Sequence, residues 1–546
     1  MKRKEREIKI IYVYVLLVFA GFLAIPIIQL LLQSFRGDGA VGLSNYVEII
    51  SERGFLQALG NSVVVSLSAA VIATVLAFFL AYTIHYTNVN KKFKKLIRLL
   101  AVLPMLLPTI TYGFAIIYSF GKQGLLTRLF GRQLFEIYGF WGLLFGYVIY
   151  TLPISFLLIF NTMGFIDKKF MVVSRVMGDK PFATFMQTVI RPLLGTLAAS
   201  MVQCFFLSFT DYGIPASVGG KYEVVATVLY NEMLGSVPDF GRGAVVAMMM
   251  LIPSIISITL LHYLEKYNVR YNKISDVEIK KNYARDGVCS VVSVLILAVM
   301  LSIFAVIFVV PLVEEWPYRT NFTMEHVEAV LEDGSLFGVY KNSLFVAVCT
   351  SLLGLVTTYG AALATARSQL GQKWKGVIES IALITNTIPG MVIGIAFMLV
   401  FSGTSLQNTF LLIIVCNVVH FFSTPYLMMK NTLSKLNLSW ETTAALMGDS
   451  WAKTIFRIVT PNMIPTILEV FSYYFVNAMV TVSAVIFIAG ARTMVITTKI
   501  KELQYYTKFN EVFVLSLLIL VTNLIVKGVL GFVINRKSKK AKKEKK

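Results

Sequence analysis

The stretch that decides the fold is residues 440–461, Trp-Glu-Thr-Thr-Ala-Ala-Leu-Met-Gly-Asp-Ser-Trp-Ala-Lys-Thr-Ile-Phe-Arg-Ile-Val-Thr-Pro. It lies between two long apolar runs and contains the triplet Met447-Gly448-Asp449. The same triplet, Met177-Gly178-Asp179, stands 270 positions earlier, again between apolar runs. A segment that recurs at this distance indicates a chain built from two similar halves.

Further matches extend this repeat towards the start of each half. Asn61-Ser62 corresponds to Asn342-Ser343, and the prolines and glycines match in the same register, with an offset of 281. Asn161-Thr162 corresponds to Asn431-Thr432 with an offset of 270. Because each half contains an even number of apolar runs, both halves face the same way. We therefore expect a pseudo-twofold axis along the membrane normal and a central pathway between the halves.

The composition places the chain in a membrane. Hydrophobic residues make up 57% and charged residues 14% of its 546 residues, and its apolar runs have the roughly 20 residues needed to cross a bilayer. We expect an all-α integral membrane protein with 12 transmembrane helices in two parallel six-helix repeats. The expected spans are 8–34, 58–86, 96–120, 138–162, 193–217, 243–265, 288–312, 340–367, 376–402, 409–431, 463–489 and 510–535. The first run is long and has no small-residue cleavage site, so it is interpreted as a retained helix.

Charge sets the orientation and the boundaries. The net charge of +21 is concentrated in short loops and in the basic tail, the pattern expected of cytoplasmic segments. Both termini are therefore predicted to be cytoplasmic, with the tail facing lipid head groups rather than nucleic acid. The four cysteines have no ligand or disulfide spacing, and no cofactor or metal is expected on this chain. The predicted units are the repeats 1–265 and 288–535, the cytoplasmic linker 266–287 and the tail 536–546.

The segment after the fourth span of each half is helical in pattern, with a break at the glycine and a proline near its end. The second copy resembles the Glu-Ala-Ala, Gly, Ile-x-Leu-Pro signature of ABC importer permeases, although Glu441 lies one residue early and Thr460 replaces the leucine. The first copy has no glutamate, and its proline comes one residue late. An amphipathic surface helix is the alternative interpretation. The residues expected to form the two ATPase-docking loops are Ser174, Gly178, Asp179, Pro192, Glu441, Ala444, Ala445, Gly448, Asp449, Ile458 and Pro461.

The resemblance implies the type I ABC importer permease fold in the inner membrane of a bacterium. It also implies two copies of an ABC ATPase subunit and an external solute-binding protein as partners. The chain contains no Gly-x-x-x-x-Gly-Lys-Ser/Thr loop, so ATP and Mg are expected on the partner ATPase and this chain is not expected to be an enzyme.

Prolines, glycines and small polar residues within the spans are candidates for the pathway or its gates. Breaks in membrane helices expose backbone groups that must face protein or water, although a packed kink is an equally valid interpretation of any single proline. The candidates are Pro108, Gly113, Pro153, Asp211, Tyr212, Thr385, Asn386, Pro389, Gly394, Pro425, Thr481 and Ser483.

The resemblance narrows to the fused permeases that serve ferric iron, thiamine and phosphonates. Residues 209–222, Phe-Thr-Asp-Tyr-Gly-Ile-Pro-Ala-Ser-Val-Gly-Gly-Lys-Tyr, are similar to the branch assigned to 2-aminoethylphosphonate. A phosphonate or another small phosphorylated anion is therefore the expected solute, with ferric iron as the alternative. A secondary transporter coupled to an ion gradient is a more remote alternative, because few acidic or basic residues stand within the spans.

Overall fold

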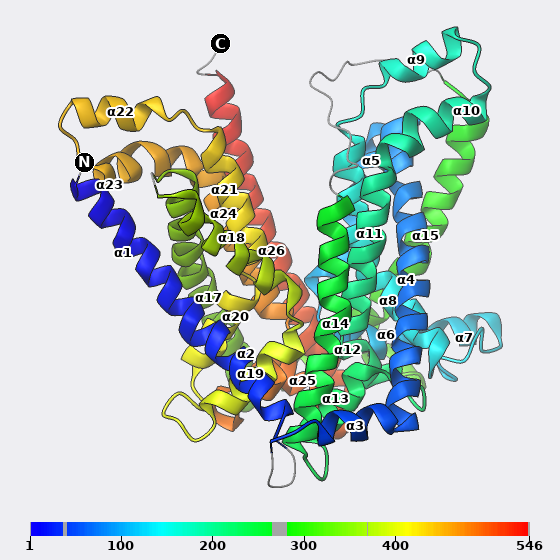
Figure 1. The fold of residues 1–546 in the computed structure, drawn as a ribbon. Helices are drawn as coiled ribbons and strands as arrows, with labels where there is room; N and C mark the ends of the chain where they lie inside the picture. Colours follow the sequence, from blue (N-terminus) through cyan, green and yellow to red (C-terminus); the bar gives the residue numbers. More distant parts are fainter. Residues whose placement is uncertain (1, 37–40, 265–280, 369, 544–546) are drawn as a thin grey trace.

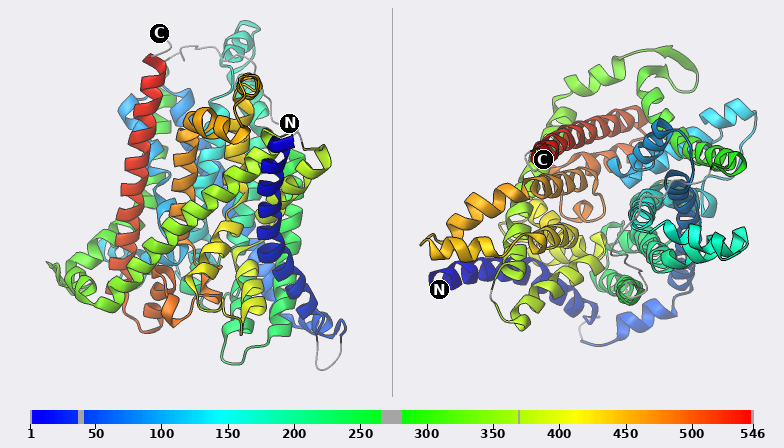
Figure 2. Two further views of the ribbon diagram at one scale, coloured as in Figure 1. Left: turned by 90° about the vertical axis from the view of Figure 1, so that its left-hand side faces the viewer. Right: turned by 90° about the horizontal axis from the view of Figure 1, so that it is seen from above.

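The computed structural model describes residues 2–36, 41–264, 281–368 and 370–543. Within these ranges the chain is almost wholly helical and forms two groups of long helices side by side (Figures 1 and 2). The first half comprises α1 Lys2–Phe19, α2 Ile25–Ser34, α3 Ser44–Ser51, α4 Arg53–Tyr86, α5 Lys91–Leu100, α6 Thr109–Phe120, α7 Leu125–Phe130, α8 Phe140–Met163, α9 Lys169–Val176, α10 Pro181–Phe185, α11 Arg191–Thr210, α12 Gly213–Val218, α13 Val225–Leu234 and α14 Phe240–Leu264. The second half comprises α15 Tyr283–Val309, β1 Val313–Glu315, β2 Arg319–Phe322, α16 Glu325–Glu332, α17 Gly334–Ala366, α18 Gln372–Thr387, α19 Gly390–Phe401, α20 Phe410–His420, α21 Ser423–Lys435, α22 Ser439–Leu446, α23 Trp451–Thr454, α24 Thr460–Val480, α25 Ile496–Tyr505 and α26 Phe509–Lys543.

The all-helical membrane architecture is as predicted, but the count of 12 spans is not reproduced. In the described ranges, nine helical stretches are long and apolar enough to cross a bilayer, and two bent pairs raise the number to eleven. The expected span 96–120 is divided between α5 and α6. Because lysines crowd α5 and Pro104 and Pro108 interrupt the run, neither helix is long and apolar enough by itself.

The third span of the second half is broken in the same way. The axis bends by 104° between α18 and α19, where Pro389 begins α19 in an extended conformation with φ −58° and ψ 147°. Pro108 does the same at the start of α6, with φ −62° and ψ 145°. Each proline lacks a backbone N–H and restricts the residue before it, so a helix ends before it and a new one starts.

The two halves exchange their first helices. α1 and α2 lie along α17 and α19 of the second half, although α2 also packs against α14 of the first half. In the same way, α15 lies along α4 and α6 of the first half (Figure 1). Tyr12 Oη donates to the carbonyl of Trp374 at 3.2 Å, and the rings of Phe19 and Phe422 lie 4.5 Å apart. The packed bodies therefore differ from the sequence repeats by one helix each. Most of the predicted linker 266–287 lies outside the described residues.

Repeated residues make repeated contacts. Ser62 Oγ accepts a hydrogen bond from the backbone N–H of Val225 at 2.8 Å, and Ser343 Oγ accepts one from Ile496 at 2.7 Å. Asn61 and Asn342 donate to backbone carbonyls just before α13 and α25. Each Asn-Ser pair thus holds the N-terminus of one short helix, where backbone N–H groups lack partners within the helix.

The two ends of the molecule differ in composition. The N-terminus and the glycine turns that follow α9 and α22 lie at one end, called here the turn face (Figure 1). The β1–β2 hairpin and α16, rich in glutamate, lie at the opposite end (Figure 2). Among the described residues, hydrogen bonds that join the two packed bodies lie away from the turn face. Thr111 Oγ1 lies 3.0 Å from Ser516 Oγ, and Asn523 Nδ2 donates to the carbonyl of Leu106 at 3.0 Å.

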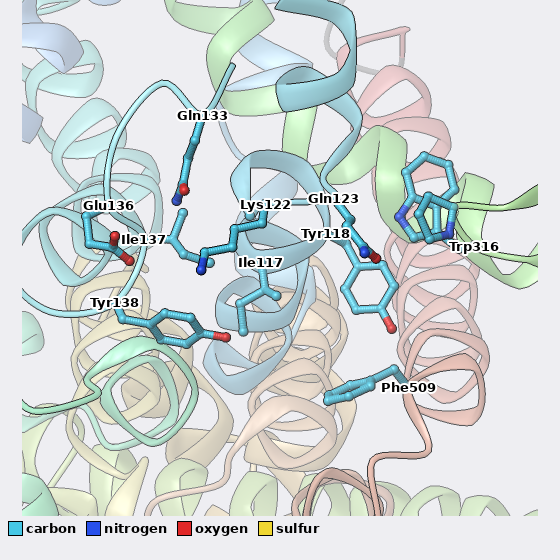
Figure 3. A pocket seen from close by; sticks show the side chains of 12 residues that line it. Ile117, Tyr118, Lys122, Gln123, Gln133, Glu136, Ile137, Tyr138, Trp316 and Phe509 are labelled. Atoms are coloured by element: carbon cyan, nitrogen blue, oxygen red, sulfur yellow. The ribbon is translucent and has the colours of Figure 1, made fainter. Parts of the chain in front are cut away.

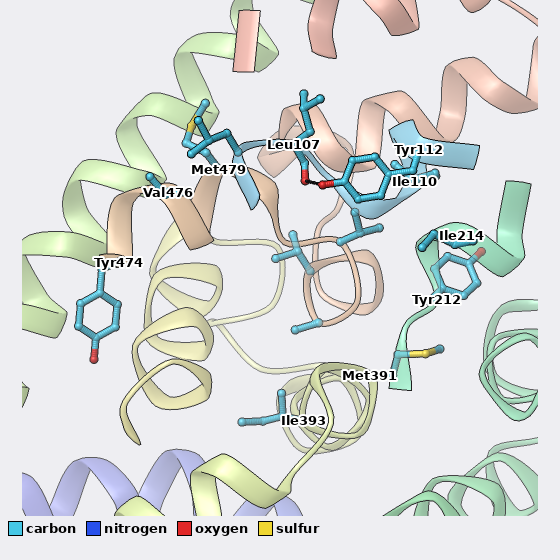
Figure 4. Close-up of a cluster of buried hydrophobic side chains, with 14 of the residues drawn as sticks. Leu107, Ile110, Tyr112, Tyr212, Ile214, Met391, Ile393, Tyr474, Val476 and Met479 are labelled. Carbon is cyan, nitrogen blue, oxygen red and sulfur yellow. Dashed lines mark hydrogen bonds between the residues drawn. The ribbon is translucent and has the colours of Figure 1, made fainter. Parts of the chain in front are cut away.

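The buried core is continuous between the halves. Figure 4 shows part of one buried cluster that includes Leu107, Ile110 and Tyr112 of the first half and Met391 and Ile393 of the second. The rings of Phe114 and Phe509 add a contact at 5.6 Å. Apolar packing therefore joins the halves at this level, as expected for the interior of a helical membrane protein.

Candidate functional site

The two predicted docking segments have the same backbone geometry. Gly178 has φ +87° and Gly448 has φ +82°. The N–H of Asp179 donates to the carbonyl of Ser174 at 3.1 Å, and the N–H of Asp449 donates to that of Ala444 at 2.9 Å. A left-handed glycine after the last helical turn closes the helix and reverses the chain. Each segment is therefore a helix, a turn and a second short helix.

The prolines that end the signature take equivalent places in spite of the shift in sequence. Pro192 and Pro461 are each the second residue of α11 or α24, directly after a five-residue π-helical segment, Met186–Ile190 or Ile455–Val459, through which the helix continues. α10 has five residues and α23 has four, so α10 absorbs the extra residue before Pro192. Ile458 lies in the π-helical segment Ile455–Val459, directly before α24.

The side chains that brace the two turns differ. In the first segment, Ser174 Oγ donates to Asp179 Oδ2 at 2.6 Å. In the second, the position of Ser174 is taken by the buried Ala444, and Asp449 pairs with Lys453. Ala445 faces outward. In the first turn, a side-chain hydrogen bond thus joins the residues on the two sides of the glycine. In the second turn, an ion pair joins Asp449 to Lys453 of α23.

Glu441 faces inward. Its Oε1 lies 3.2 Å from Nε of Arg367, and the two side chains are 7% and 0% exposed. The same guanidinium donates through Nη1 to the carbonyl of Leu436 at 2.9 Å and through Nη2 to that of Asn437 at 3.1 Å. One buried cation therefore holds both the segment before α22 and the first turn of α22.

The tips of the two segments are apolar and exposed. Val176 and Met177 are 82% and 77% exposed, and Leu446 and Met447 are 85% and 79% exposed. Apolar side chains presented at matched positions on the turn face are typical of a surface that contacts another protein.

The predicted pathway glycines are sites of close packing. A Cβ on Gly113 would lie 2.1 Å from Cβ of Ser217, and one on Gly394 would lie 2.4 Å from the carbonyl oxygen of Ala484. In each half the absence of a side chain lets the segment after the fifth span lie directly against the second part of the third span. Ser483 packs in the same way against Gly390.

The fifth spans end at equivalent residues. Asp211 follows α11 and Thr481 follows α24, both in extended conformation. Asp211 Oδ2 accepts from the N–H of Ile214 at 2.9 Å and so caps α12. Thr385 donates to a carbonyl in its own helix, at 3.0 Å from Ala382, and Asn386 is exposed at the end of α18. Pro153 lies within α8, and Pro425 lies in the first turn of α21.

Lys501 of α25 reaches across to the first half. Its ammonium lies 5.9 Å from the ring centre of Tyr212 and 5.8 Å from that of Tyr230, and the two rings are stacked 4.7 Å apart. Burial lowers the pKa of Lys501. Next to it, Gln504 donates to the carbonyl of Ala216 at 2.9 Å. A cation is therefore set against two aromatic faces where the halves meet.

A cavity of about 520 Å³ lies away from these residues, beside the hairpin at the end opposite the turns. Figure 3 shows side chains of Lys122, Gln133 and Tyr138 around one side and Trp316 and Phe509 around the other. The predicted pathway residues are not among its lining residues. This cavity is thus separate from the predicted pathway.

Sequence reasoning missed Arg367 and Lys501. A basic residue at the end of a span is normally interpreted as a determinant of orientation, and nothing in the spacing of Arg367 points to a partner in α22. Lys501 could have been found through the repeat, because it occupies in α25 the place that Tyr230 occupies in α13.

Comparisons with known proteins give a consistent result. A family model described as the binding-protein-dependent transport system inner membrane component matches residues 73–267 and 354–539, once in each half. The chain is 23% identical over 496 residues to a ferric transport system permease protein of Haemophilus influenzae, covering 88% of this chain and 78% of that protein. It is 23% identical over 509 residues to the ferric transport system permease protein FbpB of Actinobacillus pleuropneumoniae, covering 89% and 72%. The spermidine/putrescine transport system permease protein PotC of Escherichia coli is 24% identical over 250 residues, covering 44% of this chain and 89% of that protein.

Proposed function

Because this chain belongs to the family of inner membrane components of binding-protein-dependent transport systems, we propose that it forms the translocation pathway of an ATP-driven importer. The observation that carries the proposal is the pair of glycine turns, at φ +87° and +82°, on one end of a duplicated membrane protein. Two turns with the same backbone geometry can each bind one copy of the same ATPase subunit.

In this proposal the turn face is cytoplasmic. The exposed apolar tips at Val176–Met177 and Leu446–Met447 enter grooves of two ATPase copies, and ATP with Mg is bound and hydrolysed there. Movement of the ATPases pulls the two segments and rocks one body against the other. The solute-binding protein delivers its cargo to the opposite end, between the bodies.

The proposed solute is ferric iron. Two relatives that match 88% and 89% of this chain are named as ferric transport permeases, which supports the ferric alternative better than the phosphonate interpretation of residues 209–222. Selection of the solute is assigned mainly to the binding protein, since related permease folds serve many solutes.

The test is uptake by vesicles that contain the chain, its ATPase and its binding protein. Labelled ferric iron should accumulate only with internal ATP, and excess 2-aminoethylphosphonate should not compete. Uptake driven by an ion gradient without ATPase would reject the importer function. ATP-dependent uptake of labelled 2-aminoethylphosphonate, with none of ferric iron, would keep the importer and reject ferric iron.

A further inference from the structure

Glu441 is the glutamate of the second docking segment, yet it does not face the surface on which an ATPase would dock. Its side chain is 7% exposed, and that of its partner Arg367 is fully buried. By contrast, Leu446 and Met447, one turn further along α22, are among the most exposed apolar residues. An ATPase seated on these tips would meet apolar side chains rather than the Glu441 carboxylate.

The position of Arg367 explains what the carboxylate does. Arg367 follows α17 directly and is 3% exposed. Its guanidinium donates hydrogen bonds to the carbonyls of Leu436 and Asn437, after α21. It also forms an ion pair with the carboxylate of Glu441 in α22, at 3.2 Å but without the alignment of a hydrogen bond. A planar guanidinium with several donors suits such a multipoint contact better than an ammonium. Three helices are joined at this one side chain.

A second contact holds the other arm of the same segment. Glu7 Oε2 accepts from the backbone N–H of Ala452, in the first turn of α23, at 3.2 Å. Glu7 belongs to α1, the helix that the first half contributes to the second body. Carboxylates are favourable at helix N-termini, where backbone N–H groups point outward.

The first docking segment has a different anchor. Through the two repeat registers, Arg367 corresponds to Tyr86 and Glu441 to Met171, so an ion pair cannot form between these two residues. Tyr86 is buried, and Lys168 places its ammonium 5.6 Å from that ring. Neither member of the ion pair is present at the corresponding position of the first half, which is expected if the two residues act as one unit.

We propose that Arg367 and Glu441 form an internal anchor that fixes the second docking segment rigidly to α17 and α21, and that Glu441 is a positioning residue rather than a contact to the ATPase. The proposal rests on the docking function proposed above. It implies that when the ATPase moves the second docking segment, the second body moves with that segment. The first segment, which has Tyr86 and Met171 at the corresponding positions, is expected to be fixed less rigidly.

The experiment measures the order of the segment without any ATPase. Spin labels are placed at Leu446, on the tip, and at Val356, an exposed position of α17, in a chain whose four cysteines are replaced. Glu441→Gln should broaden the distance distribution, shifting the equilibrium between anchored and loosened segments by about tenfold, as expected for a coupled buried pair. The exchanged pair Arg367→Glu with Glu441→Arg should narrow it again.

The first half provides a matched control and a gain of function. Labels at Val176 and Val75, the exposed positions that correspond to Leu446 and Val356, report on the first segment and should not respond to Glu441→Gln. Installing the pair there, by Tyr86→Arg with Met171→Glu, should narrow their distribution. Glu441→Gln should also lower the solute imported per ATP hydrolysed, while ATPase affinity stays within about twofold.

The outcomes separate this inference from the proposed function. Unchanged distributions together with a large loss of ATPase affinity in Glu441→Gln would overturn the anchor and make Glu441 a direct contact. Broadened distributions in a chain that binds no ATPase would support the anchor and reject docking. If Arg367→Glu with Glu441→Arg does not fold, Arg367→Lys keeps the charge and removes the multipoint contact, and broadening is again expected.

Discussion

Gly178 and Gly448 both have a positive φ and open space around them. A Cβ added at either turn would meet nothing within 4 Å, so steric crowding does not select glycine there. The positive φ does, because a residue with a Cβ loses roughly 1–2 kcal/mol in this conformation. Asparagine is the best tolerated alternative, and β-branched residues are the worst.

These preferences predict an order of substitutions at Gly448. Gly448→Asn should retain ATPase binding and uptake, whereas Gly448→Val should lose most of both, because the helix can no longer close and reverse. Copurification of the ATPase with the solubilised permease measures the effect. Gly528→Val is the control, since Gly528 has open space around it and no positive φ. Equal behaviour of the asparagine and valine variants would contradict a role for backbone conformation.

Gly113 permits a second prediction, which depends on steric crowding rather than on backbone conformation. Gly113→Ala should lower the free energy of unfolding by about 1–3 kcal/mol through overpacking, because the new methyl group would lie 2.1 Å from Cβ of Ser217. Ser217→Gly should restore much of this loss. Thermal unfolding of the purified protein measures both.

Gly394 supplies the contrast for Gly113→Ala. A methyl group there would meet the backbone of Ala484 at 2.4 Å, so no side-chain change at Ala484 should rescue Gly394→Ala. Rescue at both sites, or at neither, would show that the close approaches are not what limits these positions.

At the scale of elements, the repeat predicts which segments correspond but not how they bend. Pro108 and Pro389 were identifiable from the sequence as breaks in matching spans, and both begin a new helix. The apolar residues of 96–120 predict a single span, but Pro104 and Pro108 divide this stretch, so the structure has two helices there. The exchange of α1 and α15 has no sequence signature, since apolar faces pair with any complementary face.

The exchange of the first helices predicts which helices lose stability when α1 and α2 are removed. Deleting residues 2–34 should speed amide hydrogen exchange in α17 and α19, which lose contacts such as Tyr14 Oη to Thr357 Oγ1 at 3.0 Å. Peptides from α4 and α8 should change little, although they lie closer in sequence. Faster exchange confined to α4 and α8 would mean that α1 serves its own repeat.

At the scale of the whole molecule, the two bodies meet away from the turn face. Among the described residues, neutral hydrogen bonds join them there, such as Thr111 with Ser516 at 3.0 Å and Gln504 with the carbonyl of Ala216 at 2.9 Å. Such contacts are weak enough to break during a transport cycle, since each contributes about 0.5–1.5 kcal/mol. The twofold symmetry is approximate: Lys501 stands where the repeat places Tyr230, and the Arg367–Glu441 pair stands where it places Tyr86 and Met171.

If the bodies rock against each other, a covalent bond between them at this end should stop transport. Thr111→Cys with Ser516→Cys, in a chain without its native cysteines, should lose uptake on oxidation and regain it on reduction. The matched control joins two helices of one body: Thr83 Oγ1 and Ser293 Oγ lie 2.9 Å apart on α4 and α15. Thr83→Cys with Ser293→Cys should crosslink without loss of uptake, because α15 moves with the first half. If both crosslinks stop uptake, α15 does not move together with the first half. If neither crosslink stops uptake, the contact between Thr111 and Ser516 does not open during transport.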